Sequence, residues 1–264
     1  MIDLTSYKTV SVDVENGIAT ITLNLPSTGN AFDGVMHDEL TEALYAVNGD
    51  RRVRALILTG AGDNFCAGGD PNYIRELTPD DYSEVFLTVR RLIQNLINLD
   101  RPIVAAVNGD AVGVGATVAL FCDIIVGADD GVIVDPHVMG SGLAAGDGGA
   151  LMWALQLGLP RAKYHLFTGR PLAMTAAAEA GLINETTSRS SVLARAQEIA
   201  REIADGPGPG MRGTKRIFSK IVESIGSSVI EFAAEQERLS IYTDDHKETM
   251  LADLENRSPR YRNT

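Results

Sequence analysis

The chain has 264 residues, of which 45% are hydrophobic, and its 35 acidic residues outnumber the 23 basic ones, giving a net charge of −12. This length is enough for one large domain or for a domain with an appendage. The acidic balance argues against nucleic acid or an anionic membrane surface as a partner.

The sequence carries no mark of a membrane or secreted protein. No apolar run reaches the length of a membrane span, and the first ten residues, MIDLTSYKTV, lack the apolar stretch of a signal peptide. Cys66 and Cys122 are too few for a disulfide framework, so a reducing compartment is expected. The sequence therefore predicts a cytoplasmic protein.

Strands and helices are expected to alternate in the first third of the chain. Residues 7–25 alternate between apolar and polar side chains around Asn16-Gly17, which predicts a β-hairpin. The elements expected next are a loop at 26–29, a helix at 35–47, a buried strand at 53–59, a glycine-bearing bend at 65–70 and a helix from 79 to about 98.

The segment 101–149 is the one around which the rest of the chain is expected to be arranged. A buried strand at 102–107 is followed by a glycine-rich turn, a helix beginning at about Val114, and a second strand at 123–127. The first N–H groups of a helix lack intrahelical acceptors, so this turn can present donors to a developing negative charge. His137 and Asp147 follow on expected loops.

Beyond residue 149 the pattern is helical. Helices are expected at 151–157, 161–168, 175–180, 190–204, about 211–225, 228–242 and 245–255. The segment DGPGPG at 205–210 cannot continue a helix and is expected to be a linker. These patterns predict an α/β core, residues 1–205, with a helical C-terminal extension, residues 206–264, that packs at subunit interfaces.

Five motifs carry a family resemblance. In chain order they are FCAGGD, RPIVAAVNGDAVGVG, ALFCDIIVGA, GDGG and LFTGRPLAMTAAAEAGLINE. Together they resemble the crotonase (enoyl-CoA hydratase/isomerase) superfamily over roughly residues 7–255. The resemblance implies an α/β spiral of ββα units, a homotrimer or a dimer of trimers, and an oxyanion hole formed by the backbone N–H groups of Gly69 and Val114. Such a pair of donors stabilises an enolate or oxyanion by on the order of a few kcal/mol.

The chain departs from the hydratase-like members of that superfamily at two positions. Those members carry a Glu on the glycine-turn helix and another in a Gln-Pro-Glu context, and the two carboxylates deprotonate water. Here the positions hold Thr117 and His137, the latter in Asp135-Pro136-His137. Since Thr117 cannot act as a base, hydration by two carboxylates is not expected.

The substituted residues resemble the 6-oxocamphor hydrolase type, which cleaves β-diketones by retro-Claisen hydrolysis. The resemblance implies that His137, oriented by Asp147, activates water, with His37 and Glu237 as further catalytic residues. Phe32 stands where that type has a Trp, and Gly115 where it has an additional histidine. Phe32, Thr117 and Trp153 are expected in the substrate pocket.

Each of these residues also has an ordinary structural interpretation. His137 can be a loop histidine and Asp147 a helix N-cap. His37 can face solvent on its helix, Glu237 can lie on a solvated charged face, and Trp153 can belong to the core.

An acyl-CoA enzyme, an enoyl-CoA hydratase or isomerase, is the alternative function. In it Asp147 alone shuttles a proton, because residues 142–147 resemble the Leu-Ala-Ala-Asp loop of dienoyl-CoA isomerases with one residue inserted. The FCAGGD bend favours a CoA thioester as substrate. The loop at 24–30 lacks basic residues, however, and Arg75 is the nearby cation for a phosphate.

Cofactors and non-catalytic functions are not expected. No His, Cys and Asp cluster has metal-ligand spacing, and the glycine-rich turns fit neither a dinucleotide fingerprint nor a P-loop, so neither a metal nor a redox cofactor is predicted. An RNA-binding or scaffolding relative would need a basic stripe or missing oxyanion glycines, and the sequence has neither. A small-molecule carbonyl compound is the expected partner.

Overall fold

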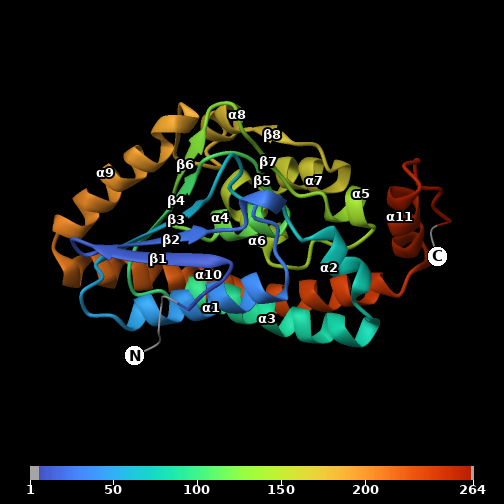
Figure 1. Cartoon of the computed structure of the whole chain (residues 1–264), viewed down its shortest axis with the longest axis horizontal. Coiled ribbons are helices and arrows are strands. Elements are labelled where there is room, and N and C mark those ends of the chain that lie inside the picture. The colour runs from blue at the N-terminus through green and yellow to red at the C-terminus, as the bar shows by residue number, and fades with distance from the viewer. Residues whose placement is uncertain (1–5, 263–264) are drawn as a thin grey trace.

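A six-stranded sheet runs through the molecule in the order β1-β2-β3-β4-β6-β9, in a computed structural model that describes residues 6–262 (Figure 1). The strands are β1 (Val10–Glu15), β2 (Ile18–Leu23), β3 (Ala55–Gly60), β4 (Ile103–Val107), β6 (Ile124–Ala128) and β9 (Glu185–Thr187). β1 and β2 pair antiparallel, and the other neighbours pair parallel. Asn16 and Gly17 both have positive φ, as a two-residue hairpin turn requires, so the predicted hairpin is confirmed.

A second sheet of three short strands, β5 (Ala111–Val112), β7 (Val132–Val134) and β8 (Leu172–Ala173), lies beside the first. The other short elements are 3₁₀ turns at Pro26–Thr28 and Arg189–Ser191 and the helices α2 (Pro71–Glu76), α4 (Val114–Leu120), α5 (His137–Ser141), α6 (Gly149–Leu157), α7 (Leu159–Thr168) and α8 (Met174–Glu179). The sequence predicted a loop at His137, whereas the structure places this residue at the start of helix α5.

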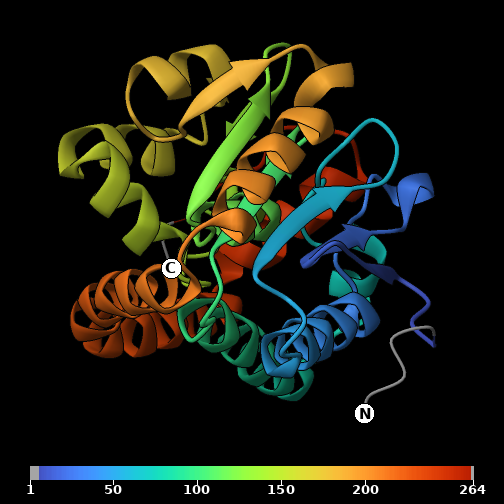
Figure 2. The same cartoon turned by 90° about the vertical axis from the view of Figure 1, so that its left-hand side faces the viewer.

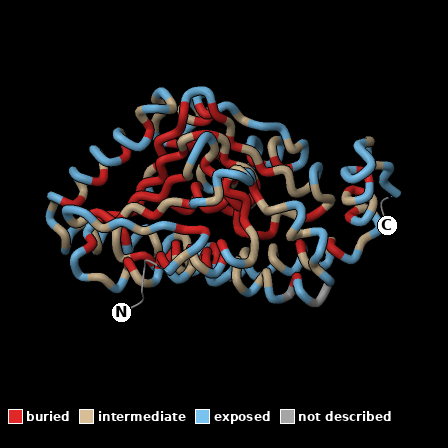
Figure 3. The backbone as a smooth tube through the Cα atoms, in the orientation of Figure 1, coloured by how far each residue is buried: buried red, intermediate tan, exposed pale blue. Residues whose placement is uncertain are grey.

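The two faces of the large sheet pack into separate hydrophobic cores, because alternate residues of a strand point to opposite faces. On one face Ile57 and Val104 pack against α9 (Val192–Asp205), whose small buried side chains recur every fourth residue. Figure 2 shows α9 lying across that face. On the other, Leu56 and Leu58 join the core formed with α1 (Gly34–Gly49), α3 (Pro79–Ile97), α4 and α6. Burial is concentrated in these central layers (Figure 3).

The C-terminal region is helical, as predicted, but its division differs. One 34-residue helix, α10 (Gly208–Ile241), replaces the two helices expected at 211–225 and 228–242, and part of the expected linker belongs to its first turn. Pro209 is tolerated there because a first-turn N–H needs no intrahelical acceptor. α10 packs along α3 and α6 of its own chain. Packing on a neighbouring subunit stays a prediction.

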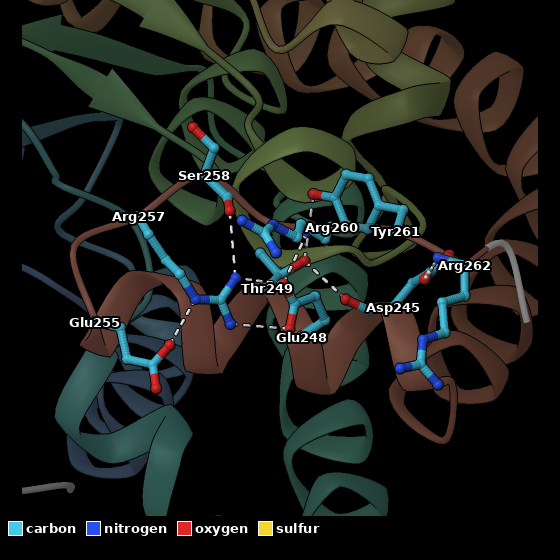
Figure 4. Close-up of polar contacts among 9 residues, drawn as sticks. All are labelled: Asp245, Glu248, Thr249, Glu255, Arg257, Ser258, Arg260, Tyr261 and Arg262. Atoms are coloured by element: carbon cyan, nitrogen blue, oxygen red, sulfur yellow. Dashed lines mark hydrogen bonds and ion pairs between the residues drawn. The ribbon is translucent and has the colours of Figure 1, made fainter.

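The last helix, α11 (Asp244–Leu254), is held by the segment that follows it. Figure 4 shows Arg257 paired with Glu248 and Glu255, while the Tyr261 hydroxyl and Thr249 Oγ1 lie 3.3 Å apart. The helix also contacts α5, because His246 Nδ1 lies 2.7 Å from the Ser141 carbonyl oxygen. No helix among residues 6–262 is both long and apolar enough to cross a membrane.

Candidate active site

A cavity of about 190 Å³ lies between α2 and α3 on one side and the starts of α4 and α5 on the other. Side chains of α2 and α3 and the segment between them give it an aromatic and aliphatic wall, formed by Tyr73, Ile74, Leu77, Tyr82, Val85, Phe86 and Val89. Its polar groups come from α1, α5, α10 and the turn before α6. The cavity therefore offers an apolar space with polar groups gathered on the remaining walls.

Two segments meet at this cavity through a parallel bridge between Cys66 and Ala111. Backbone hydrogen bonds of 2.9 and 3.0 Å hold the bridge. Gly69 and Val114 each lie three residues beyond a bridged residue, and both line the cavity. The glycine bend and the start of α4 thus face the same space.

The N–H groups of Gly69 and Val114 are available to a ligand. Val114 begins α4, so its N–H has no intrahelical acceptor. Within residues 6–262 no hydrogen bond from either N–H is found. Gly68 and Gly113, the residues before the two donors, have φ of +98° and +52°, backbone conformations that favour glycine. The expected oxyanion donors therefore lie where a carbonyl oxygen could reach them.

His137 is held by Asp135, and not by Asp147 as predicted from the sequence. Asp135 Oδ1 lies 2.6 Å from His137 Nδ1 and also accepts the backbone N–H of His137 at 3.1 Å. From the sequence, Asp135 was expected only as part of the Asp135-Pro136-His137 motif, although a carboxylate two residues before a histidine can reach back to it.

Asp147 is held from two other directions. Its Oδ2 accepts a hydrogen bond from Thr117 Oγ1 at 2.8 Å, and its Oδ1 accepts one from the Gly149 N–H at 2.9 Å. Thr117 is fully buried behind Asp147 and does not line the cavity, contrary to its expected place in the pocket wall. Donor atoms of Asp135, His137 and Asp147 lie within 4.8 Å of one another, so these residues could hold a metal ion, although their sequence spacing gave no such indication.

Glu237 and His37 enter the cavity from distant elements. Glu237 reaches it from α10, with Oε1 3.8 Å from His137 Nε2, so it does not lie on a solvated face. His37, in the first turns of α1, is buried against Phe32 with their ring centroids 4.8 Å apart, and both line the cavity.

Two expected residues lie elsewhere. Trp153 is fully buried in the core beside His165, with ring centroids 5.7 Å apart, and does not line the cavity. The prediction that it belongs to the pocket is wrong, because the apolar face of α6 turns toward the core. Arg75, the proposed phosphate cation, contacts Asn72 and Asp253.

The charges of this cluster are strongly coupled. Burial lowers the pKa of His137, but the negative charges of Asp135, Asp147 and Glu237 and the hydrogen bond to Asp135 outweigh it, so the pKa lies well above its ordinary value. Burial raises the pKa of Asp135, yet the charge and hydrogen bonds of His137 hold it below its usual range. An imidazolium paired with a carboxylate is therefore the state near pH 7.

The pKa values of the other two carboxyl groups, Asp147 and Glu237, are raised and not lowered. Burial, reinforced by the charge of Asp135, raises the pKa of Asp147 despite its hydrogen bonds. Burial raises the pKa of Glu237 to about 8, with Asp147 and Asp135 adding to the effect and His137 opposing it. The Glu237 carboxyl can therefore exchange a proton close to neutral pH, and the Asp147 carboxyl holds its proton to a higher pH than an ordinary aspartate.

Comparisons with known proteins agree with this architecture. Residues 13–264 match the enoyl-CoA hydratase/isomerase family model. The chain is 33% identical to the 1,2-epoxyphenylacetyl-CoA isomerase of Escherichia coli (strain K12), covering 94% of this chain and 96% of that one. It is 28% identical to the short-chain-enoyl-CoA hydratase of Clostridium acetobutylicum, covering 94% and 95%. An enoyl-CoA hydratase/isomerase structure from Mycobacterium paratuberculosis superposes with a TM-score of 0.88, at 30% identity and over 93% and 99% of the chains.

The chain belongs to the enoyl-CoA hydratase/isomerase family, and its α/β crotonase fold with a helical C-terminal region is confirmed. It is an enzyme of the crotonase superfamily. None of the relatives named above is a β-diketone hydrolase, so the finer resemblance to the 6-oxocamphor hydrolase type gains no support from them.

Proposed function

We propose that this protein isomerises an acyl-CoA thioester by moving a proton between carbons of the acyl group, with Asp147 as the acid and base. The observation that carries the proposal is the 2.6 Å contact of His137 with Asp135, beside an Asp147 carboxyl of raised pKa. That contact keeps the imidazole charged, so the proton acceptor is a carboxylate, and Asp147 is chosen because residues 142–147 resemble the loop that carries the catalytic Asp of dienoyl-CoA isomerases. A proton carrier works best when its pKa lies near the working pH.

Each residue of the site has a separate role in the proposed reaction. The Asp147 carboxylate removes a proton from a carbon of the acyl group, and the electron pair moves to the thioester oxygen as an enolate. The N–H groups of Gly69 and Val114 donate hydrogen bonds to that oxygen, which stabilises the enolate by on the order of a few kcal/mol. Asp147 then returns the proton to a second carbon, and the double bond shifts. The charged His137 lowers the energy of the negative intermediate.

Hydrolysis of a β-diketone by a His137-activated water is the second candidate. It is favoured by the presence of a histidine in the cavity where hydratase-like members have a Glu. It requires a neutral imidazole to take a proton from water, and the pKa of His137, well above its ordinary value, opposes that state at neutral pH. It is therefore the weaker of the two.

The test is incubation with short 3-enoyl-CoA and 2-enoyl-CoA thioesters in deuterium oxide, with cyclic 1,3-diketones in parallel. Isomerisation of the double bond, lost by about a thousand-fold in Asp147→Asn, would support the proposal. Diketone cleavage without thioester turnover would replace it with the hydrolytic alternative.

We also propose that the enzyme works as a homotrimer or a dimer of trimers. Phe218, Ile225, Phe232 and Leu239 recur every seventh residue along α10, so they form one stripe, and each is exposed in the single chain. Contiguous exposed apolar side chains of this kind mark interaction surfaces.

A further inference from the structure

His37 is a buried polar side chain in the cavity that the proposed reaction does not use. It is only 6% exposed, and its Nδ1 is fully buried. No hydrogen bond to either ring nitrogen is found among the described side chains and backbone, and Nε2, unlike Nδ1, is not fully buried, so Nε2 is the nitrogen that a ligand in the cavity can reach. Its ring position is fixed by the edge contact with Phe32 and by the N-cap of α1, where Asp33 Oδ1 accepts the Met36 N–H at 2.7 Å.

The His37 imidazole is neutral near pH 7. Burial lowers the pKa of His37 to about 4. A neutral imidazole has one N–H donor and one acceptor nitrogen. Since a buried polar group without a partner is unfavourable, a ligand that supplies the missing partner gains affinity over one that does not.

The missing partner is not the thioester carbonyl. The proposed reaction assigns that oxygen to the N–H groups of Gly69 and Val114, and no hydrogen bond or ion pair within the described part of the chain joins His37 to the charged cluster of Asp135, His137, Asp147 and Glu237. The α2 and α3 wall of the cavity is apolar or aromatic. A pure hydrocarbon chain would fill this space and leave the imidazole unpaired.

We propose that the acyl group of the substrate carries a second oxygen function, a hydroxyl, carbonyl or ring ether, which forms a hydrogen bond with Nε2 of His37. The cavity thereby selects oxygenated acyl-CoA thioesters over hydrocarbon ones. This inference rests on the proposed acyl-CoA isomerase function. His37 is a specificity-determining residue, and proton transfer stays with Asp147.

Calorimetric titration with unreactive thioesters tests the inference. Phenylacetyl-CoA is compared with its ortho-, meta- and para-hydroxylated forms, because the cavity is lined by aromatic side chains. We expect at least one hydroxylated thioester to bind the wild-type enzyme roughly 10- to 100-fold more tightly than phenylacetyl-CoA. His37→Leu should abolish the preference, and His37→Asn, which keeps a donor and an acceptor, should restore part of it.

Asp38→Asn is the matched control, since this exposed residue lies next to His37 on α1 and should leave the preference unchanged. Equal affinity for all four thioesters, or an unchanged preference in His37→Leu, would overturn the inference about His37 and leave the acyl-CoA function standing. Failure of every thioester to bind would overturn the acyl-CoA function. In that case the affinities for phenol and for toluene test His37 without CoA. If the wild type prefers phenol and His37→Leu does not, the hydrogen-bonding role of His37 stands. If the two affinities are equal, that role is overturned as well.

Discussion

One carboxylate oxygen of Asp135 contacts His137 twice, at the ring Nδ1 at 2.6 Å and at the backbone N–H at 3.1 Å. It therefore fixes both the orientation of the imidazole and the first turn of α5. Because Asp135 is almost fully buried, its charge acts on the ring with little screening by water. The raised pKa of His137 makes the imidazole a positive group near pH 7, which is why the proposed mechanism assigns proton transfer to Asp147.

Asp135→Asn should return His137 toward an ordinary titration. Loss of the paired charge lowers the pKa of the imidazole by about 1 to 3 units. Nuclear magnetic resonance of the enzyme labelled with ¹⁵N-histidine measures this directly, because the chain has only four histidines. We expect isomerisation to fall roughly 10-fold at the same time. Asp130→Asn, at an exposed carboxylate, is the control, and an unchanged His137 titration in Asp135→Asn would contradict the assigned pairing.

Thr117→Val should shift the pH profile of the reaction. The Thr117 hydroxyl donates to Asp147 Oδ2 and lowers the pKa of that carboxyl, so its removal from this buried site raises the pKa further. The acidic limb of kcat is expected to move up by about 1 pH unit, with roughly a 10-fold loss below it. Thr117→Ser keeps the hydroxyl and should behave like the wild type. A profile of Thr117→Val that coincides with the wild type would show that Thr117 does not position Asp147.

Glu237→Gln should stabilise the enzyme at alkaline pH. The folded-state pKa of Glu237 is raised from 4.5 to about 8, so the folded chain holds a proton that the unfolded chain has lost between these values. Stability therefore falls as the pH rises from 4.5 through 8. The Tm of Glu237→Gln relative to the wild type is expected to rise by roughly 5 °C between pH 5 and pH 9.

The neighbouring Glu235→Gln supplies the control for that measurement. Glu235 is exposed and paired with Arg238, and the loss of such a surface pair should leave its Tm nearly parallel to the wild type at both pH values. If the difference in Tm between Glu237→Gln and the wild type is the same at pH 5 and pH 9, the Glu237 carboxyl of the folded wild-type enzyme is not desolvated.

Phe232→Glu should break the proposed oligomer. The side chain is 65% exposed in the single chain and lies on the apolar stripe of α10, so a charge there would be buried unpaired at a subunit interface. Light scattering should give about 85 kDa, or twice that, for the wild type with its 28.2 kDa chain, and a lower mass for the variant. Tyr45→Glu, at an exposed aromatic residue on α1, should keep the wild-type mass. A monomeric wild type would disprove the assembly.

The sequence alone determined the features that depend on local chemistry. Asn16-Gly17 predicted the hairpin, because few other pairs adopt two consecutive positive φ angles. The glycine-bearing motifs predicted turns at 65–70 and before Val114, and the family resemblance implied that the N–H groups of Gly69 and Val114 serve one site, which agrees with both residues lining the cavity. The α/β class and the helical C-terminal region followed from hydrophobic periodicity.

The tertiary structure decided which groups meet. Asp135, two residues from His137, took the role expected of Asp147, because the start of α5 turns the imidazole back onto the preceding carboxylate. Glu237 reaches the cavity only because α10 continues without a break to its end. Trp153 faces the core because α6 turns its apolar side inward. A sequence pattern fixes which face of an element is apolar, whereas the pKa of each carboxyl depends on burial and on charges brought close by folding, which no local pattern specifies.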